Sequence, residues 1–431
     1  MRCMKRLLIW IKRLVPNRHP VRLWWHFGKS FLAALVHRFP ARKLTVIGIT
    51  GTDGKTTTVG MVTHILRQCG RKVGSAGTAY FDTDGKHEEN VTQKTSMDPF
   101  LLQRFLRRLV KARCEYAVIE VSSHGLVQGR VNHISPSVSA ITNTSPEHLD
   151  YHGTMEQYQK DKGKLFKMLN GAGTKVLNGS DSSFDLFSKI KSDETIIYGN
   201  KDSDLWISDV KADALSSSAH LHTDLGGEVE IKLSIPGVFN LENALCAVSC
   251  TQALGIPLGD SLRALETYKG APGRMERIDE GQNFNVFVDF TVTPVAYEKT
   301  LKTLRQIVGE NGRVLVLCGS CGDRMQEKRP EVGRVVSELA DIMVVSNEDP
   351  YTEDPEKIID EVWSGVDKSK IDAHKILDRR EGMEFLLKKA EPGDAVVFCA
   401  KGADTTMWTK EGRVPWDERA IVRGILRSIC L

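Results

Sequence analysis

A glycine-rich segment at residues 48–58, Gly-Ile-Thr-Gly-Thr-Asp-Gly-Lys-Thr-Thr-Thr, constrains the fold of this chain more than any other feature. It follows a short apolar run and precedes a helical pattern of apolar residues. A strand, a glycine turn and a helix in this order form a phosphate cradle, in which backbone N–H groups hold the anion, Lys55 adds a positive charge and the Thr56 hydroxyl can bind Mg²⁺. The standard P-loop spacing has a glycine where this chain has Ile49, so the segment follows the variant pattern Gly-Thr-x-Gly-Lys-Thr.

The length and composition of the chain indicate a globular protein with more than one domain. At 431 residues it is too long for a single ordinary core, so we expect two or three domains. No apolar run approaches the roughly 18 residues that a membrane-spanning helix needs. The nine cysteines lack the paired spacing of a disulfide framework, which favours a reduced, cytoplasmic protein.

The first 43 residues differ in charge from the rest of the chain. They hold eleven Lys and Arg residues and no Asp or Glu, whereas the other 388 residues hold 48 Lys and Arg against 55 Asp and Glu. The segment also contains Trp10, Trp24 and Trp25 and two apolar clusters, at residues 7–11 and 31–36. This pattern predicts a basic amphipathic segment that contacts the surface of an anionic membrane. The alternatives are a helix packed on the body of the protein and a nucleic-acid-binding arm.

Alternating strand and helix patterns predict an α/β fold. Residues 44–273 form a P-loop-type central domain with a parallel sheet, whose strands lie at 44–49, 116–121 and 138–143. The polar stretch 180–235 predicts an antiparallel insertion or extension. From Pro272-Gly273-Arg274 the pattern restarts, with strands at 284–290, 313–317, 342–346 and 394–399. Residues 274–431 are therefore predicted to form a C-terminal doubly wound (Rossmann-like) α/β domain.

Several polar residues follow the predicted strands, where open α/β sheets bind their ligands. Glu120 ends one strand and is a candidate Mg²⁺ ligand, because Mg²⁺ prefers carboxylate oxygens beside phosphates. His148 and His152 follow the next strand, and a lysine-rich helix around Lys162 comes after them. On the pattern alone, a solvated face is the better explanation of that helix.

These motifs, taken together and in this order, resemble the Mur ligase family and most closely its MurE branch. The matching segments are Gly51-Thr-Asp-Gly-Lys-Thr56, Glu120-Val-Ser-Ser-His124, Thr142-Asn143, His148-Leu-Asp-Tyr-His-Gly-Thr-Met-Glu156, Asn240 with Asn243-Ala244, Pro272-Gly-Arg-Met-Glu276, Val288-Asp-Phe290, Gly322-Asp-Arg324, Lys328-Arg-Pro330 and Trp416-Asp-Glu-Arg419. The resemblance covers residues 44–431.

The resemblance implies an ATP-dependent ligase that joins an amino acid to the carboxylate of a muramyl peptide through an acyl phosphate, in cell wall biogenesis and hence in cell shape and division. It implies a central ATPase domain and a C-terminal domain that binds the amino acid. The implied catalytic residues are Lys55, Glu120, His148, Lys162 and Arg274. The implied ATP-binding residues are Gly51, Thr52, Gly54, Lys55, Thr56, Thr57, Asn243, Arg274 and Asp289.

The resemblance also implies two Mg²⁺ ions. Thr56 and Glu120 would hold one, and His148 and a carbamate on Lys162 would hold the second, with Glu120 shared. The acceptor would contact Thr95, Ser96, Ser122, Gln128 and Arg130, and the amino-acid pocket would include Glu348, Asp349, Tyr351, Lys401 and Asp404.

The chain departs from the MurE pattern in four places. Two are lost histidines, because the family segments Lys-Gly-His-Glu and Tyr-Ala-His correspond to Lys401-Gly-Ala-Asp404 and Phe290-Thr-Val292. The other two concern the substrates. Residues 1–43 stand where MurE enzymes have a domain that binds the UDP part of the acceptor, so a lipid-linked acceptor is an alternative. The family segment Asp-Asn-Pro-Arg, which recognises diaminopimelate, corresponds to Glu348-Asp349-Pro350-Tyr351. Loss of the arginine removes the bidentate partner of the distal carboxylate, and Glu348 with Asp349 favours a cationic side chain such as that of lysine.

Two further hypotheses remain open from the sequence. One is a related ligase with another acceptor, such as a lipid-linked muramyl peptide, a poly-amino acid or a folate polyglutamate. The other is a nucleotide-binding relative without catalytic activity. In each case we expect a cytoplasmic monomer, at most peripheral to the inner face of the membrane, with no nucleic-acid partner.

Overall fold

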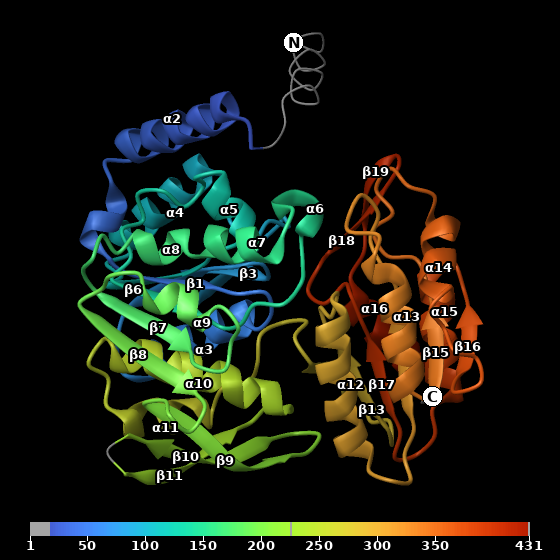
Figure 1. The fold of residues 1–431 in the computed structure, drawn as a ribbon. Coiled ribbons are helices and arrows are strands. Elements are labelled where there is room, and N and C mark those ends of the chain that lie inside the picture. The colour runs from blue at the N-terminus through green and yellow to red at the C-terminus, as the bar shows by residue number, and fades with distance from the viewer. Residues whose placement is uncertain (1–17, 225, 430–431) are drawn as a thin grey trace.

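The structure is a computed structural model that describes residues 18–224 and 226–429, and it contains two α/β units that lie side by side (Figure 1). A cavity lies between them. The first apolar cluster of the basic segment, at residues 7–11, lies outside the described residues. No helix within 18–224 or 226–429 is both long enough and apolar enough to cross a bilayer.

The central unit is built on a sheet of eleven strands in the order β11-β10-β9-β8-β7-β6-β1-β5-β2-β3-β4. Its strands are β1 (Thr45–Thr50), β2 (Val73–Ala76), β3 (Tyr80–Thr83), β4 (Lys86–Glu89), β5 (Tyr116–Glu120), β6 (Val138–Ile141), β7 (Thr174–Asn178), β8 (Glu194–Gly199), β9 (Leu205–Ala212), β10 (Ser217–Thr223) and β11 (Glu228–Leu233). In the sheet, the seven neighbouring strands β2, β5, β1, β6, β7, β8 and β9 pair in parallel. Antiparallel strands extend both edges, β3 and β4 at one and β10 and β11 at the other.

Helices cover both faces of this sheet. They are α2 (Pro20–Val36), the 3-10 turn η1 (Pro40–Lys43), α3 (Lys55–Gln68), α4 (Pro99–Lys111), α5 (Ser123–Val127), α6 (Leu149–His152), α7 (Met155–Lys162), α8 (Lys164–Lys167), α9 (Phe184–Ser188), α10 (Val238–Gln252) and α11 (Leu258–Leu265). Along β1, Ile47 and Ile49 belong to the core beneath α3, α10 and α11, whereas Val46 belongs to the core beneath α4. The alternation of a strand therefore divides its apolar side chains between two cores, which explains why the run reads as continuously apolar.

The sequence prediction of an antiparallel unit after residue 180 is wrong for its first strand. β8 pairs in parallel with β7, and the antiparallel pairing begins only at β9 with β10. The polar residues of this stretch occur because β9, β10 and β11 are partly exposed. Such a pattern predicts a strand but does not say whether the strand pairs in parallel or antiparallel with its neighbour.

The C-terminal unit contains a six-stranded sheet in the order β12-β13-β17-β14-β15-β16, parallel except for β12. Its strands are β12 (Glu276–Arg277), β13 (Asn285–Val288), β14 (Val314–Cys318), β15 (Ile342–Val345), β16 (Asp372–Lys375) and β17 (Ala395–Phe398), and a hairpin is formed by β18 (Thr406–Thr409) and β19 (Gly412–Pro415). Its helices are α12 (Pro294–Val308), α13 (Lys328–Leu339), α14 (Pro355–Trp363), α15 (Arg379–Lys389) and α16 (Glu418–Ile429). The core beneath α12, α13 and α14 lies on one face of the sheet, and the core beneath α15 and α16 lies on the other, as a doubly wound fold requires.

Polar contacts join the two units around the cleft. The Lys299 ammonium lies 3.0 Å from a Glu242 carboxylate oxygen, and the Lys328 ammonium lies 3.2 Å from Glu147 Oε1. On the other side, Trp408 Nε1 in β18 donates to Gln93 Oε1 at 2.9 Å. The carboxyl ends of β1, β5 and β6 thus face the C-terminal unit across the cleft.

Candidate active site

The glycine-rich loop connects β1 to α3 through residues 51–54 and is held by the end of β6. The N–H groups of Thr52 and Asp53 donate to the backbone and side-chain oxygens of Asn143, at 2.8 and 3.0 Å. Gly54 has φ of 79°, and a Cβ atom there would lie 2.0 Å from Asn243 Oδ1. The position therefore admits only glycine, and the turn directs the N-terminus of α3 into the cleft.

Glu120 is the centre of the hydrogen bonds beside this loop. Its Oε2 accepts from Thr56 Oγ1 at 3.1 Å and from the Thr78 N–H at 2.7 Å, and its Oε1 accepts from Thr78 Oγ1 at 2.9 Å. Lys55 donates to the Thr52 carbonyl at 2.7 Å. Burial lowers the pKa of Lys55, and the charges of Glu120 and Asp53 oppose that shift. A buried carboxylate and a hydroxyl are thus in contact at the mouth of a phosphate loop, as a Mg²⁺ site requires.

The segment after β6 adds an imidazole and a second carboxylate. His148 is the N-cap residue of α6 and has φ of 57°. Burial lowers the pKa of His148 well below the ordinary value, so the imidazole is neutral and can act as a ligand. Glu147 Oε1 accepts from Lys328 of the other unit at 3.2 Å. Its Oε2 is buried and has no hydrogen-bond partner among the described residues. This unpaired oxygen fits a site that binds cations.

Lys162 lies behind the loop, at the end of α7. Its Nζ donates to the Gly51 carbonyl at 2.6 Å and lies 4.3 Å from the centre of the Tyr158 ring. Burial lowers the pKa of Lys162 well below the ordinary value, and the charge of Lys55 adds to that shift. The solvated face that the sequence pattern allowed is therefore excluded for Lys162, although the neighbouring Lys160 is exposed.

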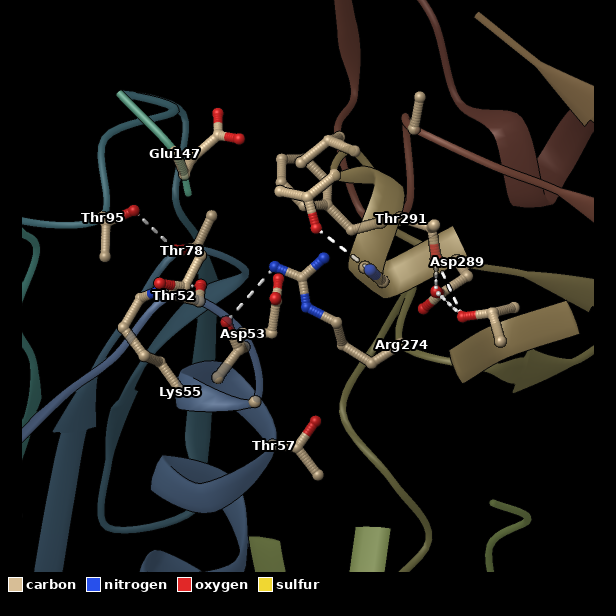
Figure 2. A pocket seen from close by; sticks show the side chains of 18 of the residues that line it. Thr52, Asp53, Lys55, Thr57, Thr78, Thr95, Glu147, Arg274, Asp289 and Thr291 are labelled. Atoms are coloured by element: carbon tan, nitrogen blue, oxygen red, sulfur yellow. Dashed lines mark hydrogen bonds between the residues drawn. The ribbon is translucent and has the colours of Figure 1, made fainter. Parts of the chain in front are cut away.

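Arg274 and Asp289 reach the cleft from the start of the C-terminal unit. Arg274 Nη2 donates to Thr56 Oγ1 at 3.3 Å, and its guanidinium lies 4.2 Å from the centre of the Phe290 ring. Asp289 Oδ1 accepts from the Met275 N–H at 2.8 Å, and burial raises its pKa. Figure 2 shows Arg274 extending between the phosphate loop on one side and Asp289 with Thr291 on the other.

Most of these groups line one cavity of about 340 Å³ between the two units. The predicted site residues in its wall are Thr52, Gly54, Lys55, Thr56, Thr57, Thr95, Glu120, His148, Asn243, Arg274, Asp289, Glu348, Asp349, Tyr351 and Asp404. The other predicted residues, Gly51, Ser96, Ser122, Gln128, Arg130, Lys162 and Lys401, are not part of this wall. Phosphate, metal and amino-acid residues predicted from distant segments thus share a single cleft.

The predicted acceptor residues form a connected network next to Glu120. Ser96 Oγ accepts from the N–H and the hydroxyl of Ser122, at 2.9 and 3.1 Å. Arg130 donates to the Ser96 carbonyl at 3.1 Å and to Gln128 Oε1 at 2.9 Å. Thr95 Oγ1 lies 2.9 Å from Thr78 Oγ1, within hydrogen-bonding distance, which connects this network to Glu120.

The predicted amino-acid pocket contains an internal cation. The Lys401 ammonium lies 2.9 Å from Asp349 Oδ1 and 3.2 Å from Asp404 Oδ2. It therefore neutralises the charge of Asp349, one of the two carboxylates that the sequence predicted to attract the cationic side chain of the substrate. Among the described residues no cation forms an ion pair with Glu348, and burial raises the pKa of Glu348 to about 7. Tyr351 stacks on Trp408 with the ring centres 5.6 Å apart. Glu348, rather than Asp349, is therefore the carboxyl group open to a ligand.

Sequence reasoning did not select Thr78, Glu147 or Lys328 as site residues. Lys328 and Glu147 stood within matching motifs, but their pairing joins residues 181 positions apart. Thr78 follows β2 with no motif around it. No group of three or more His, Cys, Asp and Glu side chains suited to a metal occurs in the described part of the chain. The predicted ligand set contains only two residues of those types, Glu120 and His148, since the others are Thr56 and Lys162.

Comparison with known proteins agrees with this arrangement. Residues 49–251 match the Mur ligase middle domain, and residues 273–402 match the Mur ligase, glutamate ligase domain. The UDP-N-acetylmuramoyl-L-alanyl-D-glutamate–2,6-diaminopimelate ligase of Geobacillus kaustophilus is 33% identical over 407 residues, which cover 93% of this chain and 82% of that protein. A solved structure of an enzyme with the same name is 29% identical, with a TM-score of 0.62, over 90% of this chain and 79% of that one.

Folylpolyglutamate synthase from Mycobacterium tuberculosis, solved with ADP, has a TM-score of 0.72 over 93% of this chain and 94% of its own, at 17% identity. This likeness concerns the fold alone. The fold and the cleft, with these relatives, define an ATP-dependent carbon–nitrogen ligase. The chain belongs to the Mur ligase family, in its MurE branch.

We predict that Gly54→Ala weakens the binding of a non-hydrolysable ATP analogue by about tenfold or more, because the added Cβ meets Asn243 Oδ1 at 2.0 Å in a backbone conformation that disfavours a side chain. Isothermal titration calorimetry measures the affinity. Gly70→Ala is the matched control, because Gly70 has a similar φ of 72° but open space around its Cβ position. Unchanged nucleotide affinity in the Gly54 variant would show that this turn does not shape the phosphate site.

Proposed function

We propose that this protein adds an amino acid to the peptide carboxylate of a muramyl peptide in peptidoglycan synthesis, with ATP converted to ADP and phosphate. The acceptor carboxylate attacks the γ-phosphorus to give an acyl phosphate, and the amine of the amino acid then displaces phosphate. The name and extent of the relative from Geobacillus kaustophilus support this assignment. The observation that carries it is Arg274, which crosses the cleft to the Thr56–Glu120 pair beside the predicted acceptor network.

The charges of the cleft suit the first step. A carboxylate nucleophile and a polyphosphate repel each other, so a site for this reaction needs several cations. Lys55 of the central unit and Arg274 and Lys328 of the C-terminal unit line the cavity, and Lys328 is fixed by Glu147 and the Val292 carbonyl. Bound Mg²⁺ would supply further neutralisation of the phosphate charge.

We propose that the site holds two Mg²⁺ ions, as the resemblance implies. Thr56 and Glu120 would hold one ion, and neutral His148 with the carbamate of Lys162 would hold the second, with Glu120 shared. Burial favours the uncharged amine of Lys162, and an uncharged amine is the form that combines with carbon dioxide. The carbamate would convert a buried cation into an anionic oxygen ligand.

We predict that Lys162→Ala lowers amino-acid-dependent phosphate release by about a hundredfold or more, because it removes a metal ligand. A small carboxylate such as acetate should restore part of the activity by occupying the place of the carbamate. The assay contains ATP, Mg²⁺, an amino acid and UDP-N-acetylmuramoyl-L-alanyl-D-glutamate. Lys160→Ala is the matched control, since Lys160 lies on the same helix and is exposed. Full activity in the Lys162 variant would contradict the metal assignment.

For the amino acid, we propose a cationic side chain such as that of lysine. Glu348 supports this choice because it lines the cavity without a cationic partner among the described residues. Tyr351 stands where the family arginine binds the distal carboxylate of diaminopimelate. Lys401 remains paired to Asp349 and Asp404 and orders the floor of the pocket.

The pKa of Glu348 gives this proposal a pH dependence. Because that pKa is raised to about 7, Glu348 is mostly neutral at pH 6 and mostly charged at pH 8. We predict that KM for lysine relative to KM for norleucine falls by about tenfold from pH 6 to pH 8, because only the charged carboxylate attracts the ammonium group. The ratio cancels the titration of the α-amino group that both substrates share. In Glu348→Gln the ratio should not vary with pH; a ratio that varies equally in both proteins would exclude Glu348 as the selecting group.

We further propose that the protein is a cytoplasmic monomer and that residues 1–43 bring it to the inner face of the membrane. These residues include eleven Lys and Arg and no Asp or Glu, which supports contact with anionic lipid. The exposure of apolar side chains on α2 supports the same contact. The buried residues Ser30, Ala33 and Ala34 also pack α2 onto the central unit, so one helix combines the membrane and packing roles that the sequence left as alternatives.

A further inference from the structure

Helix α2 has an apolar stripe on its outer face. Val21, Trp24, Trp25, Leu32, Leu35 and Val36 are all exposed and recur at the spacing of one helix face. The relative exposure of Trp24 is 75% and that of Trp25 is 72%. The opposite face, with Ser30, Ala33 and Ala34, is buried, so the stripe is not needed to hold the helix in place.

A contiguous apolar stripe with two adjacent tryptophans is uncommon on the surface of a soluble protein and indicates a binding surface. The cations beside it select the partner. Arg38, Arg42 and Lys43 are exposed just after the helix, and residues 1–43 contain no carboxylate to repel an anionic surface. Apolar and aromatic side chains beside exposed cations, on a segment that itself carries no acidic residue, are complementary to an anionic lipid bilayer.

Three contacts fix α2 against the elements that carry the acceptor network and Lys162. Lys29 forms an ion pair with Asp98, which caps α4 two residues after Ser96. The rings of Phe27 and Phe31 pack on His133, with ring centres 6.3 and 5.8 Å apart, three residues after Arg130.

The third contact is the pair of Arg18 Nη1 with Asp161 Oδ2 at 2.7 Å, next to Lys162. Asp161 is fully buried and also accepts from His152 Nδ1 at 2.8 Å. In Figure 1, α2 lies over α4 and α5 at the end of the central unit that also carries α6 and α7. A surface that binds the outer face of α2 is therefore held at a fixed position relative to the acceptor side of the cleft.

From this juxtaposition we propose that the acceptor is a muramyl peptide anchored in an anionic membrane by a lipid, and that α2 docks the enzyme on the same membrane. The inference rests on the proposed ligase function and specifies its acceptor class. Docking confines enzyme and acceptor to one surface, which raises the effective concentration of the acceptor without any added contact to the peptide. The UDP group of a soluble acceptor is then not required for binding.

The experiment compares two acceptors that carry the same muramyl dipeptide. One is the soluble UDP-linked form, and the other is linked to a polyprenyl diphosphate in vesicles of neutral lipid with about one third anionic lipid. The full-length protein should use the vesicle-bound acceptor with a kcat/KM about tenfold or more above that of the soluble one, and it should sediment with these vesicles at low salt. In the double variant Trp24→Ser, Trp25→Ser, both the sedimentation and the advantage of the vesicle-bound acceptor should disappear.

The ratio of the two rates is measured within each protein, so partial loss of folded enzyme does not affect it. Leu215→Ser is the matched control, because Leu215 is 59% exposed in the turn between β9 and β10, at the opposite end of the central unit (Figure 1). Turnover of the soluble acceptor without a gain on vesicles would overturn the inference and leave the proposed function intact. Two other results would also overturn the inference, because they would assign the stripe to another partner. One is sedimentation with neutral vesicles but not with anionic ones. The other is the formation of concentration-dependent dimers that the double variant abolishes. No turnover of either acceptor would contradict the proposed function itself.

Discussion

Repulsion between anions is the constraint on which the rest of this cleft depends. A carboxylate that attacks a polyphosphate must be brought within bonding distance of negative charge, and that approach is unfavourable without fixed cations and metal ions. Glu120, which would hold the Mg²⁺ that this requirement calls for, is buried and accepts three hydrogen bonds from Thr56 and Thr78. Arg274 completes the arrangement from the other unit through Thr56.

The same constraint explains why two domains are needed. The phosphate loop, Glu120 and the acceptor network belong to the central unit, whereas Arg274, Lys328 and the amino-acid pocket belong to the C-terminal unit. Lys328 and Glu147 form a buried ion pair across the cleft next to His148. This pair holds a cation of the C-terminal unit beside the residues of the central unit that we propose as metal ligands.

Site residues that stand within short motifs could be predicted from the sequence. Contacts between residues far apart in the chain could not. The phosphate loop, Glu120 and His148 stand at strand ends, where a short motif is enough to place them at one edge of a sheet. The pairing of Asp349 with Lys401 joins residues 52 positions apart, and it changes which carboxyl group faces the ligand. The parallel direction of β8 and the outward-facing side of α2 could not be predicted either. Periodicity identifies an apolar face of a helix or strand, but it does not identify the surface or the neighbouring strand that packs against it.

The proposed reaction begins with the activation of the acceptor carboxylate by ATP in this cleft. It is tested most directly by labelling both oxygens of that carboxylate with ¹⁸O and analysing the released phosphate by mass spectrometry. An acyl phosphate transfers one labelled oxygen from the carboxylate to phosphate when the amine displaces it, so the account predicts phosphate that carries a single ¹⁸O together with ADP. Unlabelled phosphate released together with the amide product, with the second labelled oxygen lost to water, would contradict it.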